Sequence, residues 1–247
     1  MEITRRGLLQ GAVLSGVTAL SGVAPRRAEA KPRADLGTAT ERTTPGNHRA
    51  ASLPFDPKKL RGLSEGLIRS HHEKNYGGAV RNLNSVERAI EALPASAAGY
   101  HVAGLRQREL LFRNSVALHE LYFANLGGSG EPDGAVAPAL TTTYGDRGGF
   151  EERFRATANS LSGGSGWALL SFDLHDGGLR IQWAGDHTQA LVEARPLLVL
   201  DMYEHSYHMD YGAAAAKYVE AFMQNVDWEV VDRRYETALK VAAQPRA

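Results

Sequence analysis

The chain has 247 residues, 43% of them hydrophobic, which is enough to bury the core of a two-part domain or of two small domains. Its 28 Lys and Arg residues balance 28 Asp and Glu residues, so the overall charge gives no reason to expect a nucleic-acid partner. The sequence contains no cysteine, which excludes thiolate ligands, cysteine nucleophiles and disulfides. A metal ion would have to be bound by His and carboxylate side chains.

The first thirty residues are typical of an export signal (residues 1–30) rather than of a folded domain. Arg5 and Arg6 precede an apolar stretch, residues 8–24, and small residues around Ala28 offer a cleavage site. The pattern is similar to a twin-arginine signal, which exports folded proteins; a Sec signal or a single membrane anchor are the alternatives. Because Gly, Ser and Thr dilute the apolar run, we expect no stable membrane anchor after processing and a periplasmic or secreted protein that begins near Lys31.

A linker and then a first helix are predicted next. Residues 31–52 are rich in Thr, Arg, Ala, Pro and Gly without periodicity, which indicates a disordered linker. From Pro57 to about Leu93, apolar residues recur at three- and four-residue spacing, which predicts a helix. His71 extends its apolar face by one turn, whereas His72 is turned about a third of the way round the helix.

A second long helix is predicted at about residues 103–125, after the pattern breaks at Pro94. Its apolar face is broad, and His119 lies in the middle of that face. Two long helices joined by a short break indicate an antiparallel hairpin over residues 53–126, with His71 and His119 on facing surfaces. A lone histidine on an apolar face is usually a core residue, so this pattern leaves both a core role and a ligand role open.

The second half has the pattern of a small mixed domain, residues 135–242, after a Gly-rich linker. The Gly-rich run before Trp167 lacks the Gly-Lys-Ser/Thr ending of a phosphate-binding loop and precedes a strand, so we reject that function. Together the two halves predict an α+β fold, in which an N-terminal antiparallel helical hairpin packs on a C-terminal α/β domain with a small antiparallel sheet. We expect helices at residues 136–144, 149–160 and 213–231, a β-hairpin at 168–174 and 179–183, and a buried strand at 196–200.

That buried strand ends in a candidate metal-binding pair. Asp201 directly follows the apolar run, and His205 comes four residues later. A carboxylate at a strand end and an imidazole on the turn after it can reach one ion, and such oxygen and nitrogen donors suit a divalent first-row metal. Taken alone, Asp-x-x-x-His is more often a strand cap beside a core histidine.

Residues 201–208 resemble the Asp-x-Trp-Glu-His-small-aromatic-aromatic signature of the iron/manganese superoxide dismutase family. Tyr203 replaces the Trp and His208 replaces the second aromatic residue. The segment from His71 is similar to the family's His-His-x-Lys-His-His-x-x-Tyr-Val-x-x-Leu-Asn, and the segment around His119 to its Asn-His-x-x-Phe-Trp. With weaker similarities near Trp167 and in the tail, the resemblance covers about residues 53–240.

The resemblance implies the function and the site. It implies a superoxide dismutase that converts superoxide to oxygen and hydrogen peroxide, with one iron or manganese ion per subunit. It implies a homodimer or a dimer of dimers, in which Glu204 bridges to the ligand histidine of the other subunit. His187 would act in catalysis by hydrogen-bonding the metal-bound solvent, and a histidine there favours iron; an ordinary loop histidine is the alternative. The metal ligands would be His71, His119, Asp201 and His205.

Three departures from the family pattern keep a second function open. Asn75 stands where the family has a histidine outside the ligand set, and Ala79 where it has the Tyr that guards the substrate funnel. The family's anion-guiding Arg is absent from residues 213–216, where Lys217 is the nearest cation. The alternative is an exported, non-enzymatic metal-binding protein on the same fold. A separate zinc site formed by His72, His205 and His208 is disfavoured because no fourth ligand is evident.

Overall fold

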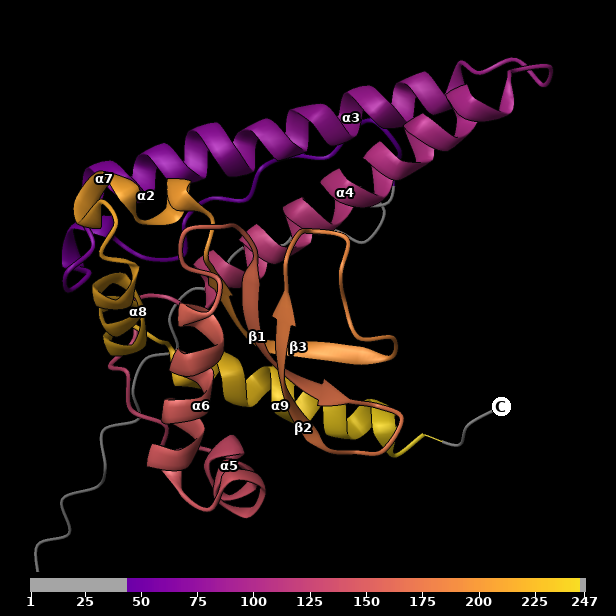
Figure 1. Ribbon diagram of the computed structural model, residues 1–247. Helices are drawn as coiled ribbons and strands as arrows, with labels where there is room; N and C mark the ends of the chain where they lie inside the picture. The colour runs from indigo at the N-terminus through magenta and orange to yellow at the C-terminus, as the bar shows by residue number, and fades with distance from the viewer. Residues whose placement is uncertain (1–43, 245–247) are drawn as a thin grey trace, which may run out of the picture. The chain divides into compact units, whose positions relative to one another are not determined.

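The computed structural model describes residues 44–244, so the predicted export signal and most of the predicted linker lie outside the described residues. The fold is α+β, with a helical N-terminal region and a C-terminal α/β region built on a small antiparallel sheet (Figure 1). The helices of the predicted hairpin fall within residues 53–126 and the later elements within 135–242, while the division into two domains stays a prediction. Across residues 44–244 we find no helix that combines the length and the apolar character needed to cross a membrane.

The first predicted helix begins later than its apolar pattern suggests. A short 3-10 helix, η1 (Pro57–Lys59), is followed by Gly62, whose φ of 72° is incompatible with a right-handed helix. The main helix then starts at Ser64, whose side chain accepts the N–H of Leu67 as an N-cap. It runs without a break through α2 (Glu65–Ser70), the π-helical turn η2 (His71–Tyr76) and α3 (Gly77–Glu91). Such π turns inside α-helices are often found at functional sites.

The second helix, α4 (Gly99–Ala124), lies antiparallel beside α3 and completes the hairpin (Figure 1). Its N-terminal half is largely exposed, and Tyr100 is 85% exposed. Its C-terminal half contacts β3 and is buried at Ser115, His119 and Tyr122. The half that packs on the C-terminal region therefore carries the predicted ligand.

The end of the predicted linker is fixed to α3. The carboxylate of Glu87, only 4% exposed, accepts the N–H of Gly46 at 2.6 Å and lies 2.8 Å from Nε2 of His48. The N–H of His48 donates to Oδ1 of Asn84 at 2.8 Å. Further along, the N–H of Ala51 donates to the Tyr76 hydroxyl at 2.7 Å. We call residues 44–51 the N-terminal strap. Where the sequence predicted a disordered linker, hydrogen bonds hold this segment against the helix.

The sheet has three antiparallel strands in the order β2-β1-β3. They are β1 (Trp167–Asp173), β2 (Leu179–Ala184) and β3 (Ala194–Asp201), preceded by α5 (Val136–Tyr144) and α6 (Arg147–Asn159). All seven residues of β1 are buried, which explains its continuous apolar sequence. Gly166 leads into this strand with a φ of 142°, and a Cβ there would lie 2.2 Å from the carbonyl oxygen of Ala184.

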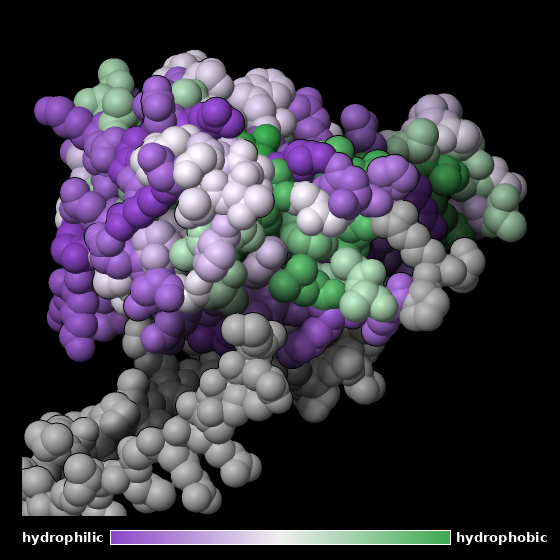
Figure 2. All heavy atoms as spheres, turned by 90° about the horizontal axis from the view of Figure 1, so that it is seen from below, coloured by the Kyte–Doolittle hydropathy of each residue, from purple (hydrophilic) through white to green (hydrophobic). Residues whose placement is uncertain are grey.

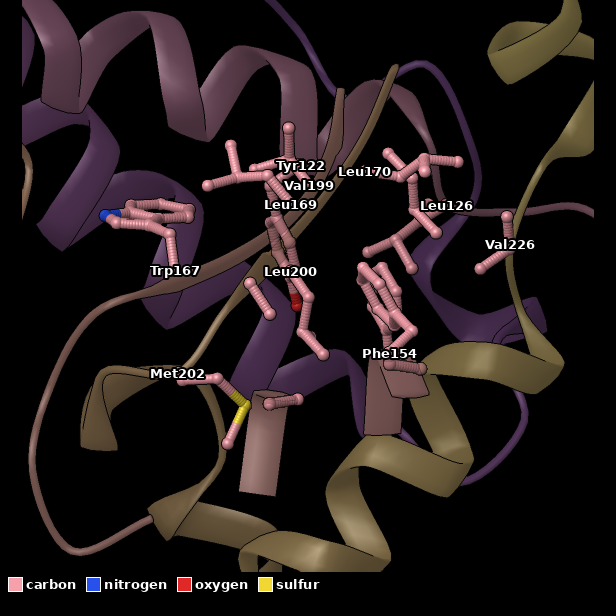
Figure 3. Packing of buried hydrophobic residues seen from close by; sticks show 14 of the residues in the cluster. Tyr122, Leu126, Phe154, Trp167, Leu169, Leu170, Val199, Leu200, Met202 and Val226 are labelled. Carbon is pink, nitrogen blue, oxygen red and sulfur yellow. The ribbon is translucent and has the colours of Figure 1, made fainter. Parts of the chain in front are cut away.

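Side chains from both halves of the chain form one core. Figure 3 shows residues of β1 and β3 packed with Tyr122 and Leu126 from the end of the hairpin and with Phe154 of α6. Because α4 and α9 contact β3 while α6 contacts β1 and β2, the sheet is covered by helices. This packing fixes the hairpin to the strand that ends at Asp201.

The tail forms two main helices where the sequence predicted one. After η3 (Glu204–Ser206) and α7 (His208–Tyr211), α8 (Ala215–Gln224) and α9 (Trp228–Ala242) are separated by a break at residues 225–227. The Asn225 side chain donates to the carbonyl oxygens of Arg61 and Ala221, each at 2.7 Å, and Val226 forms an isolated bridge with Leu126. The two long-range contacts, to Arg61 and to Leu126, outweigh the helical periodicity that runs through the break.

Apolar residues also reach the surface. On the face drawn in Figure 2, hydrophilic residues dominate the left, whereas apolar residues gather toward the centre and right. Isolated apolar side chains on a surface are normal. The exposed large apolar residues come from several elements: Tyr100, Leu110, Trp183, Leu191, Val192, Met209 and Leu239.

Candidate metal centre

The structure brings the four predicted ligands together. One ligand atom from each of His71, His119, Asp201 and His205 lies within 4.8 Å of the other three. Oδ2 of Asp201 lies 3.1 Å from Nε2 of His71, 3.3 Å from that of His205 and 3.6 Å from that of His119. In residues 44–244 this is the one group of three or more potential ligands that meets in this way.

His71 lies at the start of the π-helical turn η2, with no exposed surface. Its ring contacts the rings of Phe123, Tyr122 and His205, at centroid distances of 4.9, 5.1 and 4.8 Å. Burial lowers the pKa of His71, against the opposing effect of Asp201. The ring is therefore neutral at physiological pH, the form in which imidazole binds metals.

His119 projects from the buried half of α4. Its Nδ1 lies 2.7 Å from the carbonyl oxygen of Ser115, one turn earlier. Because a carbonyl oxygen only accepts hydrogen bonds, Nδ1 carries the proton. The unprotonated Nε2 then faces Asp201 with its lone pair. Burial, followed by the influence of His71, lowers the pKa of His119 to about 3.

Asp201 and His205 are held by short-range structure. Asp201 ends β3, and its Oδ1 accepts the N–H of Tyr203 at 2.8 Å, which leaves Oδ2 facing the histidines. Burial alone would raise the pKa of Asp201, but the imidazoles of His205 and His71 outweigh it and hold this pKa well below its usual range. His205 lies on η3, and its ring stacks on Tyr203 with centroids 5.4 Å apart.

These four residues fit a metal ion by their chemistry. Oδ2 of Asp201 and the Nε2 atoms of all three histidines are buried without a hydrogen-bond partner. A buried polar atom without a partner is costly, and four of them facing one point is the arrangement that a bound cation would satisfy. Three nitrogens and one carboxylate oxygen suit iron or manganese.

His187 lies beside this group but is not part of it. Its Nδ1 accepts the indole N–H of Trp167 at 2.9 Å, and its ring stacks on Tyr203 with centroids 4.7 Å apart. The amide of Asn114 donates to its backbone carbonyl at 2.7 Å. Since the indole only donates, and since burial lowers the pKa of His187, the neutral ring carries its proton on Nε2. His187 is therefore held as a hydrogen-bond donor, with its ring centroid 6.2 Å from that of His119.

Two hydroxyl side chains hold the backbone carbonyl of Asp201, and one of them, Tyr218, lies outside every motif of the sequence. The hydroxyl of Tyr218 donates to the Asp201 carbonyl at 2.8 Å, and Ser206 Oγ donates to the same oxygen at 2.9 Å. Tyr218 also bonds the hydroxyl of Tyr122 at 3.1 Å. The only available signal was chemical: a tyrosine on a buried helix face needs a partner for its hydroxyl.

The remaining candidates lie apart from this group. His72 bonds the carbonyl oxygen of Ala51 through Nε2 at 2.8 Å, and His208 is exposed on α7. They do not meet His205 in a second ligand group among residues 44–244. Asn75 is partly buried, Ala79 is buried, and Glu204 is exposed in the single chain.

The fold and the site together define a class of protein, in which a helical hairpin and an α/β region each contribute two side chains to one candidate metal site. Residues 132–234 match the model of the C-terminal domain of iron/manganese superoxide dismutases. The chain is 48% identical over 189 residues to the iron superoxide dismutase of Cupriavidus metallidurans, covering 76% of this chain and 96% of that protein.

More distant relatives carry either metal in their names. The chain is 32% identical to the iron superoxide dismutase of Aquifex pyrophilus, covering 74% of this chain and 89% of that protein. It is 33% identical to manganese superoxide dismutase 2 of Haloferax volcanii, covering 76% and 96%. The chain belongs to the iron/manganese superoxide dismutase family.

Proposed function

We propose that the protein is a superoxide dismutase with one iron or manganese ion bound by His71, His119, Asp201 and His205. The observation that carries this proposal is the set of four buried, unpartnered ligand atoms facing one point. The 48% identical relative named an iron superoxide dismutase favours the enzyme over a non-enzymatic metal-binding protein. We favour iron because of His187 and because the relative that is 48% identical to this chain is named as an iron enzyme, as are two relatives that are 32% identical.

The metal, when bound, supplies a one-electron couple: one superoxide gives up an electron and leaves as oxygen, and a second takes up an electron and two protons and leaves as hydrogen peroxide. The protein's part is to hold the ion and to attract the anion. The donor set carries one negative charge, on Asp201, so a divalent or trivalent ion keeps a net positive charge that draws superoxide toward the site. The proton held on Nε2 of His187 makes this residue a hydrogen-bond donor beside the site, and we assign it that role in catalysis.

The test is activity that depends on the metal and on each ligand. Metal-free protein should show no dismutase activity by pulse radiolysis, and reconstitution with iron or manganese should restore it. A protein that takes up one ion per chain but does not consume superoxide with either metal would support the non-enzymatic alternative. Metal analysis of protein from its native host would decide between iron and manganese.

We further propose a homodimer, or a dimer of dimers, through the surface that carries Glu204. Glu204 is exposed in the single chain although it precedes a ligand, and His208 and Met209 beyond it are exposed too. In this arrangement Glu204 bonds the partner's ligand histidine, and Asn75 meets His208 across the two-fold axis, each contact occurring twice. Sedimentation velocity of Glu204→Ala should show dissociation; a monomeric parent would refute the arrangement.

Export is proposed on the sequence alone, since residues 1–30 lie outside the described part of the chain. A twin-arginine signal would carry the folded protein, with its metal already bound, out of the cytoplasm. Replacing Arg5 and Arg6 by Lys should block export, and the mature protein should begin near Lys31. Unimpaired export of this variant would favour the Sec route.

A further inference from the structure

Strand β3, which ends at Asp201, is an edge strand of the three-stranded sheet. It pairs with β1 on one side only, and its other edge has backbone groups free for other partners. The pairing contains a bulge: Leu170 pairs with Leu198 and Ser171 with Pro196, so Leu197 has no partner in β1. Bulges of this kind are common beside active sites, where they redirect the chain.

Side chains, rather than a fourth strand, satisfy this free edge at every second residue. The carbonyl of Leu197 accepts from Nη1 of Arg234 at 2.7 Å. The N–H of Val199 donates to Oδ1 of Asn125 at 2.9 Å. The carbonyl of Asp201 itself accepts from Tyr218, as described above. The edge is therefore held in one position along its length.

Two of these side chains also hold the end of α4. Nη2 of Arg234 donates to the carbonyl of Leu121 at 3.0 Å, and Nδ2 of Asn125 donates to that of Tyr122 at 2.9 Å. The backbone N–H of Asn125 is shared between these two carbonyls, at 3.2 Å from each, so the two side-chain bonds complete the C-terminal cap. Arg234 also lies 3.4 Å from Oδ1 of Asn125. Burial lowers the pKa of Arg234 only to about 10, so its guanidinium is charged at neutral pH.

The helix end and the strand edge that Arg234 joins each carry a ligand. Leu121 lies two residues after His119, and Leu197 lies four residues before Asp201. We propose that Arg234 is a positioning residue for the metal: with Asn125, it fixes α4 against β3 and thereby sets the separation of His119 from Asp201. This role rests on the proposed function. Since ligand distances at a metal site are tolerated within about 0.2 Å, a small slip of the strand would weaken binding.

The experiment compares Arg234→Met with Arg233→Met in the full chain. Arg233 is the neighbouring residue on α9, and its exposed side chain lies 3.7 Å from Glu229. Each protein is freed of metal and titrated with Mn²⁺ by calorimetry, and its melting temperature is measured metal-free and loaded. We expect Arg234→Met to bind Mn²⁺ about 10–100-fold more weakly, the range seen when residues that orient metal ligands are changed. Arg233→Met should bind like the parent.

The melting temperatures separate positioning from plain stability. At a given metal concentration, a ligand that binds the folded state more tightly raises the melting temperature further. A positioning role predicts that Arg234→Met loses much of the rise caused by Mn²⁺, and that Arg234→Lys, which keeps the charge and one of the two carbonyl contacts, recovers part of it. Equal losses in metal-free and loaded protein, with unchanged Mn²⁺ affinity, would overturn the role.

The remaining outcomes are also decisive. If Arg234→Met does not fold, Arg234→Lys carries the test: a cooperative melt with weaker Mn²⁺ binding supports the role, and unchanged binding overturns it. A parent that binds no Mn²⁺ or Fe²⁺ would overturn the proposed function, and this role with it. A parent that binds normally beside an Arg234→Met variant of equal affinity would overturn the positioning role alone.

Discussion

The two halves of the proposed ligand set are built in different ways. Asp201 and His205 are four residues apart and are placed by local structure, a strand end followed by a short helical turn. His71 and His119 lie on two long helices and meet only because α3 and α4 form a hairpin that packs on the sheet. The first pair depends on one stretch of chain, and the second on the whole fold.

Exposure separates His205 from the other three residues. The side chains of His71, His119 and Asp201 are 0%, 2% and 0% exposed, whereas that of His205 is 26% exposed. A fully buried ligand side chain contributes to the packing of the core as well as to metal binding. Substitution of a ligand near the surface should therefore destabilise the fold less. The variants below test whether this difference is real.

The largest effect is expected from Asp201→Asn. The amide keeps the shape of the side chain and can still accept the N–H of Tyr203, but it removes the negative charge that faces the three histidines. Metal affinity should fall by more than about 100-fold, beyond the range for residues that only orient ligands. Metal content after dialysis is the measurement, and a variant that retains a full complement would show that Asp201 is a structural strand cap.

His119→Ala should lose metal and stability together. The helix should stay formed because Ala is a better helix former than His. The missing ring leaves a cavity in a buried site, so metal-free protein should also be less stable, by an amount on the order of 1–3 kcal/mol. His72→Ala is the matched control: it removes a neighbouring imidazole that bonds the Ala51 carbonyl and should leave metal content nearly unchanged.

The buried residues of the site should also make metal-free protein sensitive to acid. The pKa of His119 is about 3 in the folded protein and about 6.5 in an unfolded chain. Between these values the unfolded state binds more protons, so stability falls as the pH is lowered from about 6.5 toward 3. The low pKa of Asp201 adds a loss of the same sign at lower pH, because its stabilisation is present only above the unfolded pKa.

Urea unfolding of metal-free protein between pH 7 and pH 4 measures this effect. In the parent the slope of stability against pH should include about one proton from His119. His119→Gln should lose that contribution. The same slope in both proteins would mean that His119 is not held neutral by the fold.

The division between the two pairs also explains how much could be predicted. The hairpin, α5 and the strands follow from apolar periodicity and turn residues within short stretches of sequence, and Asp201 and His205 are candidates from a local pattern at a strand end. His71 and His119 become ligand candidates only through the resemblance to a family, since periodicity alone also allows core histidines. Their meeting is a property of tertiary packing.

What the sequence did not show depends on bonds between distant residues. The break between α8 and α9 arises because Asn225 bonds Arg61, far away in the chain. The N-terminal strap has no periodicity of its own and is ordered by a buried carboxylate, Glu87, on α3. The contact of Trp167 with His187 joins the start of β1 to the loop after β2. None of these has a local pattern that could reveal it.

The N-terminal strap offers a smaller test of the helical pair, His71 and His119. The N–H of Ala51 in the strap donates to the hydroxyl of Tyr76, which ends the π-helical turn that begins with His71. The strap therefore supports the helical side of the site. Removing residues 1–43 should leave the melting temperature unchanged, because the strap remains. Removing residues 1–51 should lower it by several degrees and weaken metal retention without abolishing it. Equal melting temperatures for the two truncations would show that the strap contributes no stability.

His187→Gln should give the smallest effect, a change in the reduction potential with the metal still bound. His187 belongs to neither ligand pair, and a Gln can replace both of its hydrogen-bonding functions: its carbonyl can accept from Trp167 and its amide can donate toward the site. A change of about 0.5–1.5 kcal/mol in one hydrogen bond corresponds to roughly 20–60 mV for a one-electron couple. Redox titration followed by absorption spectroscopy measures the shift, with metal content as the control. An unchanged potential would return His187 to the role of an ordinary loop residue, whereas loss of the metal would mean that it belongs to the ligand set.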